Sequence, residues 1–156
     1  MTAGSVGGVN GTASGNWTAY KLEECRAHSG TFIVPELASG AAGLPKRFLE
    51  NPEPGQMRLW AWQCVAHGAD GILHFRWRTC RSGWEIYWQG VLDHDDRPRR
   101  RLRELARESA EFQRVGEKLV GAVREVKIGI LIDYVQDDSQ ETTLGAGPLH
   151  FTLSRR

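Results

Sequence analysis

Two short apolar runs flank a helical segment, and this order constrains the fold more than any other feature of the sequence. Residues 31–34 are β-branched and aromatic, as in a buried strand, and a proline follows them. Residues 56–67 have a helical pattern, and residues 70–78 form a second apolar run that turns polar and alternating. Because the joints are short, the pattern predicts a strand–helix–strand unit with parallel strands, and hence an α/β fold.

The helix at residues 56–67 is predicted to be buried over most of its surface. Met57, Trp60 and Cys64 recur at spacings of three and four residues and therefore share one side. Further apolar side chains cover much of the remaining circumference, namely Leu59, Trp62 and Ala66. Gly68 follows as a natural helix cap.

A second helix is predicted from about residue 97 to residue 120, with an amphipathic stripe. It opens on the basic run Arg97-Pro98-Arg99-Arg100-Arg101, which could bind phosphate or nucleic acid. A solvated helix face explains these charges better, because glutamates follow at once: Glu104, Glu108, Glu111 and Glu117. The net charge of +1, from 20 Lys+Arg and 19 Asp+Glu, gives no bulk attraction to nucleic acid or to a membrane.

The flanking segments carry weaker patterns in this 156-residue chain, which is long enough for one domain. Residues 1–19 are rich in glycine and are predicted to be a flexible segment, followed by a helix end near residues 20–27. Residues 45–54 predict a polar loop. Residues 126–132 predict a third strand, and the tail after residue 136 has no clear period. No segment approaches the roughly 20 apolar residues of a membrane span.

Neither a metal nor a cofactor is expected. Cys25, Cys64 and Cys80 form no CxxC pair, which disfavours a zinc site and a disulfide scaffold and predicts reduced thiols in the cytoplasm. The run Asp93-His94-Asp95-Asp96 predicts a turn with side-chain-to-backbone hydrogen bonds, because adjacent side chains do not easily converge on one ion. No glycine-rich phosphate loop occurs.

Two glutamates lie where parallel α/β folds place their chemistry. Glu36 comes just after the first predicted strand and before a glycine-rich stretch. Glu85 lies in the long loop after the second strand, beside Trp84, Tyr87 and Trp88. Aromatic rings grouped with a carboxylate suit a sugar, whose apolar face stacks on a ring while its hydroxyl groups donate hydrogen bonds to the carboxylate. A loop packed over the end of a barrel, without a ligand, is the alternative.

Longer stretches of the sequence resemble one family. PGQMRLWAWQCVAHGADGILHFRWR, followed by EIYWQGVLDHD and RPRRR, resembles glycoside hydrolase family 42, the β-galactosidases. Upstream, FIVPELASG resembles the family's segment around its nucleophile. Downstream, EVKIGILIDY resembles the first strand of the family's second domain, the trimerisation domain. Together these segments cover roughly residues 20–136.

The resemblance implies a partial (β/α)₈ TIM barrel, since a whole barrel takes about 250 residues. Residues 20–120 would supply strands seven and eight with their helices. Residues 121–156 would begin a Rossmann-like second domain, through which members of the family form homotrimers. With residues 1–19 as the flexible segment, these ranges complete the predicted domain organisation.

The resemblance also implies a retaining mechanism, in which one carboxylate attacks the sugar and a second transfers a proton. Glu36 corresponds to the nucleophile, and Glu85 to a residue that binds the hydroxyl groups of a β-galactoside. Trp88 stands where many members have His, and Leu44 where many have Trp, so the sugar contacts depart from the family pattern. The acid/base glutamate belongs to strand four, which this sequence does not include.

Two functions therefore stay open. In the first, the chain is a fragment of a retaining β-galactosidase for terminal β-D-galactosides, inactive alone and prone to self-association through exposed barrel edges. In the second, it is a non-enzymatic carbohydrate-binding or interaction module that uses the tryptophan-rich loop. An Asn-Glu motif encoded upstream in frame would favour the enzyme, and a stable, monodisperse product would favour the module.

Overall fold

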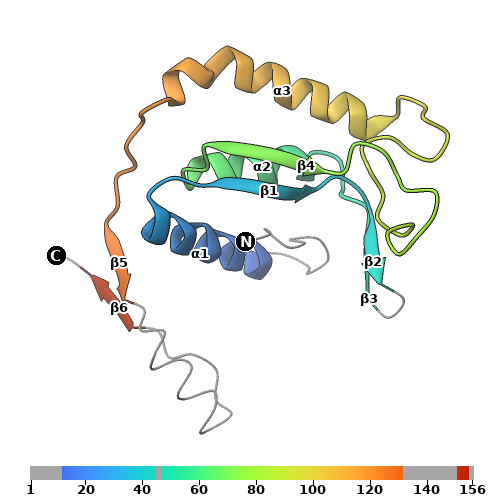
Figure 1. The fold of residues 1–156 in the computed structure, drawn as a ribbon. Helices are drawn as coiled ribbons and strands as arrows, with labels where there is room; N and C mark the ends of the chain where they lie inside the picture. The colour runs from blue at the N-terminus through green and yellow to red at the C-terminus, as the bar shows by residue number, and fades with distance from the viewer. Residues whose placement is uncertain (1–11, 45–46, 132–150, 155–156) are drawn as a thin grey trace, which may run out of the picture. The chain divides into compact units, whose positions relative to one another are not determined.

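Helices and strands alternate through most of the chain in the computed structural model, which describes residues 12–44, 47–131 and 151–154 (Figure 1). Two compact units make up the chain, and the division falls between Val120 and Gly121. The sequence predicts its second domain to begin at this position. The identity of that domain as a trimerisation domain stays a prediction.

The first unit contains two parallel strands joined through a helix. Its elements are α1 (Thr12–Ser29), β1 (Ile33–Ala38), β2 (Ala42–Leu44), β3 (Arg47–Leu49), α2 (Gln56–Ala66), β4 (Gly71–Phe75) and α3 (Arg100–Leu119). β1 and β4 lie side by side with α2 in the crossover, which confirms the predicted strand–helix–strand unit (Figure 1). β2 and β3 form an antiparallel hairpin, so the predicted loop at residues 45–54 is wrong for residues 47–49.

A β-bulge interrupts the pairing of β1 with β4. Between Val34 and Leu37, β1 has one residue more than the facing stretch of β4. Pro35 has no N–H group to donate to the ladder, and this favours an irregularity here. Strict alternation would put Glu36 on the same face as buried Val34. Because of the extra residue, Leu37 takes the buried position instead, and Glu36 is exposed.

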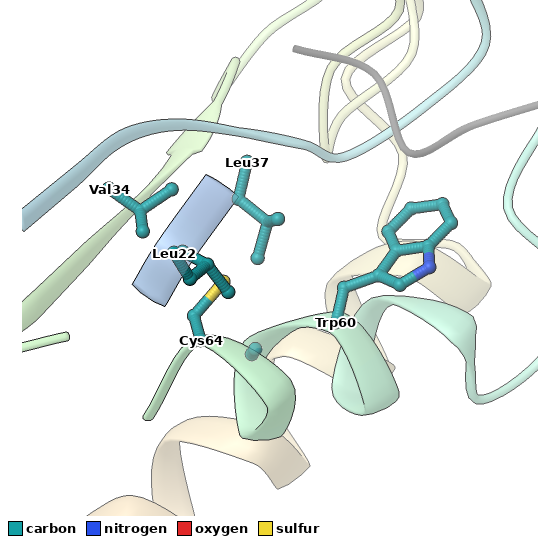
Figure 2. Close-up of a cluster of buried hydrophobic side chains, with 6 residues drawn as sticks. Leu22, Val34, Leu37, Trp60 and Cys64 are labelled. Carbon is teal, nitrogen blue, oxygen red and sulfur yellow. The ribbon is translucent and has the colours of Figure 1, made fainter. Parts of the chain in front are cut away.

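The central cluster of buried side chains in the first unit comes from three elements. Its buried side chains are Leu22 on α1, Val34 and Leu37 on β1, and Trp60, Ala61 and Cys64 on α2 (Figure 2). Burial raises the pKa of the Cys64 thiol to about 11, so this thiol is protonated at neutral pH. Leu59 on the other side of α2 is 63% exposed, so the predicted burial of most of this helix is wrong.

Charged side chains attach α3 to the rest of the unit. Glu108, of which 3% is exposed, pairs at 2.8 Å with Nε2 of His74 on β4. Glu111 accepts hydrogen bonds from Trp62 and Arg58 on α2, at 2.9 and 2.7 Å, and these bonds lower the pKa of its carboxyl group. The prediction of a solvated face for the glutamates that follow the arginine run is therefore wrong for Glu108, which is buried, whereas Glu111 keeps 24% of its side chain exposed.

α1 begins earlier than the sequence predicts. It starts at Thr12, so residues 12–19 of the predicted flexible segment are helical. Glycine, serine and asparagine in its first turns interrupt any apolar period, which explains why the sequence pattern indicates only its end. Residues 1–11 of the same predicted segment lie outside the described residues.

The second unit contains an antiparallel pair of strands. β5 (Ile128–Leu131) confirms the third predicted strand, and it pairs with β6 (Phe151–Ser154). β6 lies in the tail, for which the sequence predicts no element. Within the part of the chain that the structure describes, no helix has the length and apolar character needed to cross a membrane.

Candidate active site

Glu36 lies at the bulge near the carboxyl end of β1. Its side chain is exposed, and no other described residue forms an ion pair or a hydrogen bond with it. Its carboxylate is therefore available to a ligand. The sequence places Glu36 after a strand end, and this is wrong, because β1 continues to Ala38. The backbone irregularity, rather than a strand end, positions the side chain.

The end of β1 is joined to the loop between β4 and α3, residues 76–99, which we call the β4–α3 loop. The carbonyl oxygen of Arg76 accepts hydrogen bonds from Ser39 Oγ at 3.0 Å and from the Val91 N–H at 2.8 Å. Ser39 also donates its N–H to the Phe75 carbonyl at 3.0 Å. Ser39 and Val91 are both buried. The two strand ends and the far side of the loop therefore meet at one carbonyl group.

Two glycines allow this close approach. A Cβ atom on Gly90 would lie 2.6 Å from the carbonyl oxygen of Arg76 and 2.8 Å from the carbonyl carbon of Arg78. A Cβ atom on Gly40 would lie 2.6 Å from the carbonyl oxygen of Gln89. Backbone atoms cannot move aside without disturbing the paired strands, so only glycine fits at these two positions.

Glu85 lies in an exposed turn of the β4–α3 loop and pairs with an arginine. Its Oε2 atom is 2.7 Å from Nη1 of Arg76, the first residue after β4, and 53% of the Glu85 side chain is exposed. The neighbouring Trp84 is 86% exposed. Glu85 and Trp84, two members of the aromatic and acidic group that the sequence predicts in this loop, are therefore open to a ligand.

Trp88 packs against the end of β4. Its ring meets Phe75 edge-on, with centroids 6.3 Å apart and planes at 83°. Along β4, His74 faces α3 while Leu73 is exposed on the opposite face, and alternation puts Phe75 on the same face as Leu73. Trp88 therefore lies over the face of the sheet that also carries the exposed glutamate of the bulge, away from the helices.

The acidic run in the β4–α3 loop pairs with the arginines that follow it. Asp93 binds both Arg101 and Arg99, and Asp95 binds Arg99 at 2.6 Å. Burial raises the pKa of Asp93, but hydrogen bonds from Arg101 and Arg99 outweigh it, so the pKa is lowered. The predicted turn bond is present from the Arg97 N–H to Asp95. Arg101 is buried, so a solvated arginine run is wrong for this residue.

The arrangement brings together some of the predicted site residues. Glu36 and Trp88 lie on the same face of the β1–β4 pair. Glu85 is attached to the end of β4 by its ion pair with Arg76. Leu44 is the last residue of β2. Arg76 has no predicted role in the sequence, although its position near the carboxyl end of the predicted strand at residues 70–78 could have indicated one. Among the residues that the structure describes, no group of side chains could hold a metal ion.

A family model and two curated relatives all identify the same family. The family model for the glycoside hydrolase 42 β-galactosidases matches residues 10–115. The β-galactosidase BgaA of Clostridium cellulovorans is 31% identical over 106 residues, which are 68% of this chain and 16% of that protein. The β-galactosidase Bga of Halorubrum lacusprofundi is 41% identical over 104 residues, which are 66% of this chain and 14% of that protein.

Solved structures of β-galactosidases share the fold. The polyextremophilic enzyme from Halorubrum lacusprofundi has a TM-score of 0.64 and 29% identity, over 81% of this chain and 20% of that one. The enzyme from Bacillus circulans has a TM-score of 0.63 and 27% identity, over 73% of this chain and 17% of that one. The first unit is therefore part of a (β/α)₈ barrel, and the chain spans 14–16% of the length of these two curated relatives. Since the family model covers most of its length, this chain belongs to the β-galactosidases of glycoside hydrolase family 42.

Proposed function

We propose that this chain supplies the nucleophile and part of the galactose subsite of a retaining β-galactosidase. The bulge in β1 is the observation that carries the proposal, because it turns the Glu36 carboxylate onto the open face at the ends of two parallel strands. The carboxylate of Glu36 attacks the anomeric carbon, and the bond to the leaving oxygen breaks. Water then cleaves the covalent galactosyl ester and restores the carboxylate.

Glu85 and Trp88 hold the sugar in this proposal. The Glu85 carboxylate is exposed and accepts hydrogen bonds from the hydroxyl groups of a terminal β-D-galactoside. Trp88 offers an apolar surface on the same face of the sheet as Glu36. Where many members have His and Trp, this chain has Trp88 and Leu44, so its galactose contacts include fewer hydrogen bonds from side chains at these positions.

A retaining site needs two carboxylates about 5–5.5 Å apart, the second of which protonates the leaving oxygen. The family places this second glutamate on strand four, whereas β1 and β4 correspond to strands seven and eight. The second unit would belong to the family's trimerisation domain, and the assembled enzyme would be a cytoplasmic homotrimer. The chain alone therefore contributes half of the catalytic pair.

The isolated chain is expected not to hydrolyse a nitrophenyl β-D-galactoside. Without the proton donor the reaction loses about 10²–10⁴-fold, and the rest of the subsite is missing as well. Release of nitrophenol from the purified chain should equal the release in buffer. Turnover that persists through further purification and disappears in the Glu36→Gln variant would contradict an incomplete site.

Self-association of the isolated chain is also expected. Ile33 on β1 and Leu73 on β4 are 57% and 53% exposed on the face away from the helices. Within the described residues no third strand extends the β1–β4 sheet, so both of its edges are unpaired. Exposed edges and apolar surface of this kind promote association. Size-exclusion chromatography with light scattering should give a mass above 17.5 kDa.

A carbohydrate-binding module is the second candidate, and the exposure of Trp84 and Trp77 in the β4–α3 loop favours it. Exposed aromatic rings can stack on a sugar without any catalytic carboxylate. A monomer with a cooperative thermal transition that binds galactose would support this candidate.

A further inference from the structure

The turn that carries Glu85 lies at the surface of the first unit. Residues 81–85 are all exposed, and Trp84 is the most exposed of the large apolar side chains whose burial the structure describes in this unit. Within the turn, the Trp88 N–H donates to the Glu85 carbonyl at 2.9 Å, and the Ile86 N–H reaches the Gly83 carbonyl at 3.4 Å. These two bonds lie within the turn. On either side of it, Arg81 donates to the His94 carbonyl at 2.9 Å, and Trp88 packs against Phe75 of β4.

Arg76 attaches the Glu85 side chain itself to the end of β4. Its guanidinium group lies 2.7 Å from the Glu85 carboxylate, nine residues away along the chain. The backbone of Arg76 is fixed on both sides, because its carbonyl accepts hydrogen bonds from buried Ser39 and buried Val91. A charged donor on a rigid strand end therefore holds a carboxylate on an exposed turn.

We propose that Arg76 is a positioning residue for the sugar site: it fixes the Glu85 turn and directs the carboxylate toward a sugar hydroxyl group. The inference rests on the proposed role of Glu85 in binding a β-D-galactoside. Oε2 of Glu85 accepts a hydrogen bond from the arginine, which leaves Oε1 free to accept a hydrogen bond from a sugar hydroxyl group. Holding the acceptor in place before binding reduces the ordering cost when the sugar arrives.

The test measures amide hydrogen exchange of residues 82–88 in the full chain, with and without methyl β-D-galactoside. Exposed ion pairs are weak, so Arg76→Met should speed this exchange by about two- to fivefold without unfolding the chain. Glu85→Gln should have a similar effect, and the double variant should add little to either change. Arg58→Met is the matched control, since it removes an arginine–glutamate pair of 2.7 Å between α2 and α3 and should leave residues 82–88 unchanged.

Exchange measured with sugar distinguishes a positioning role of Arg76 from a merely structural one. In the wild-type chain, methyl β-D-galactoside should slow exchange in residues 82–88, and Arg76→Met should remove this slowing. The exchanged pair Arg76→Glu with Glu85→Arg should regain the protection without sugar, but not the slowing by sugar, because the acceptor carboxylate has moved.

Two results would overturn the proposal. The first is exchange in Arg76→Met at the wild-type rate, and the second is full slowing by sugar in Arg76→Met despite a loosened turn. A wild-type chain that shows no slowing by sugar, while Arg76→Met still speeds exchange, would instead contradict the sugar-binding role of Glu85 and support the anchoring by Arg76.

Discussion

Glu36→Gly is expected to lower galactoside hydrolysis by at least about four orders of magnitude in a complete barrel that joins this chain to the preceding strands of a relative, such as the Halorubrum lacusprofundi enzyme. The substitution removes the covalent step and leaves the β4–α3 loop in place. Azide or formate can then occupy the vacated space and attack from the same face. With an activated leaving group, azide should restore turnover and yield an α-galactosyl azide, which can be identified by NMR.

Glu85→Ala in the same barrel is the matched control. Glu85 should act by holding sugar hydroxyl groups, so its loss should cost about 1.5–3 kcal/mol in kcat/KM, as for a hydrogen bond to a charged group. Azide should not rescue this variant, because no space opens beside the anomeric carbon. Rescue of Glu85→Ala but not of Glu36→Gly would mean that the two carboxylates have the opposite roles.

Gly90→Ala is expected to destabilise the barrel by about 1–3 kcal/mol or more, because the added methyl group would meet backbone atoms of Arg76 and Arg78 at 2.6–2.9 Å. These atoms belong to the junction of β4 with the β4–α3 loop, so the change should also displace the sugar site and raise KM. Urea unfolding of the complete barrel, followed by circular dichroism, measures the first effect, and steady-state kinetics measures the second.

Gly116→Ala provides the control with the same chemical change. Gly116 lies inside α3, and an added Cβ there would meet no atom within 4 Å. Alanine should stabilise the helix by about 0.5–1 kcal/mol, since glycine has the greater conformational freedom to lose. A Gly90→Ala variant as stable as Gly116→Ala would show that the loop does not need its close approach to β4.

The order of elements around the parallel pair could be predicted from the sequence, because strand and helix patterns differ in period. The helix at residues 56–67 is found as α2, Gln56–Ala66, and the run at residues 70–78 contains β4. The hairpin of β2 and β3 could not be predicted, since strands of three residues show too little alternation. The sequence predicts the end of β1 too early, because proline usually ends a strand, whereas the bulge accommodates Pro35 within β1.

Around the site, the burial of charged side chains is the feature that the sequence predicts least well. In the sequence, Glu108 and Arg101 resemble solvated helix residues. In the structure, Glu108 is buried against His74 on β4, and Arg101 is buried against Asp93 in the preceding loop. Such pairing depends on which elements become neighbours, which a single sequence does not reveal. The same holds for Arg76, whose role depends on where the turn with Glu85 folds back. The roles predicted for Glu36, Glu85 and Trp88 stay predictions.

The bulge in β1 also matters to anyone who would transplant this glutamate into a designed barrel. On a regular strand, the sequence Val34-Pro35-Glu36-Leu37 would direct the carboxylate into the packing layer under the helices and leave the leucine facing the lumen. Copying the side chains alone would therefore produce an inverted site. A graft therefore has to include the bulged backbone with its proline, because the side chains face the correct sides only on that backbone.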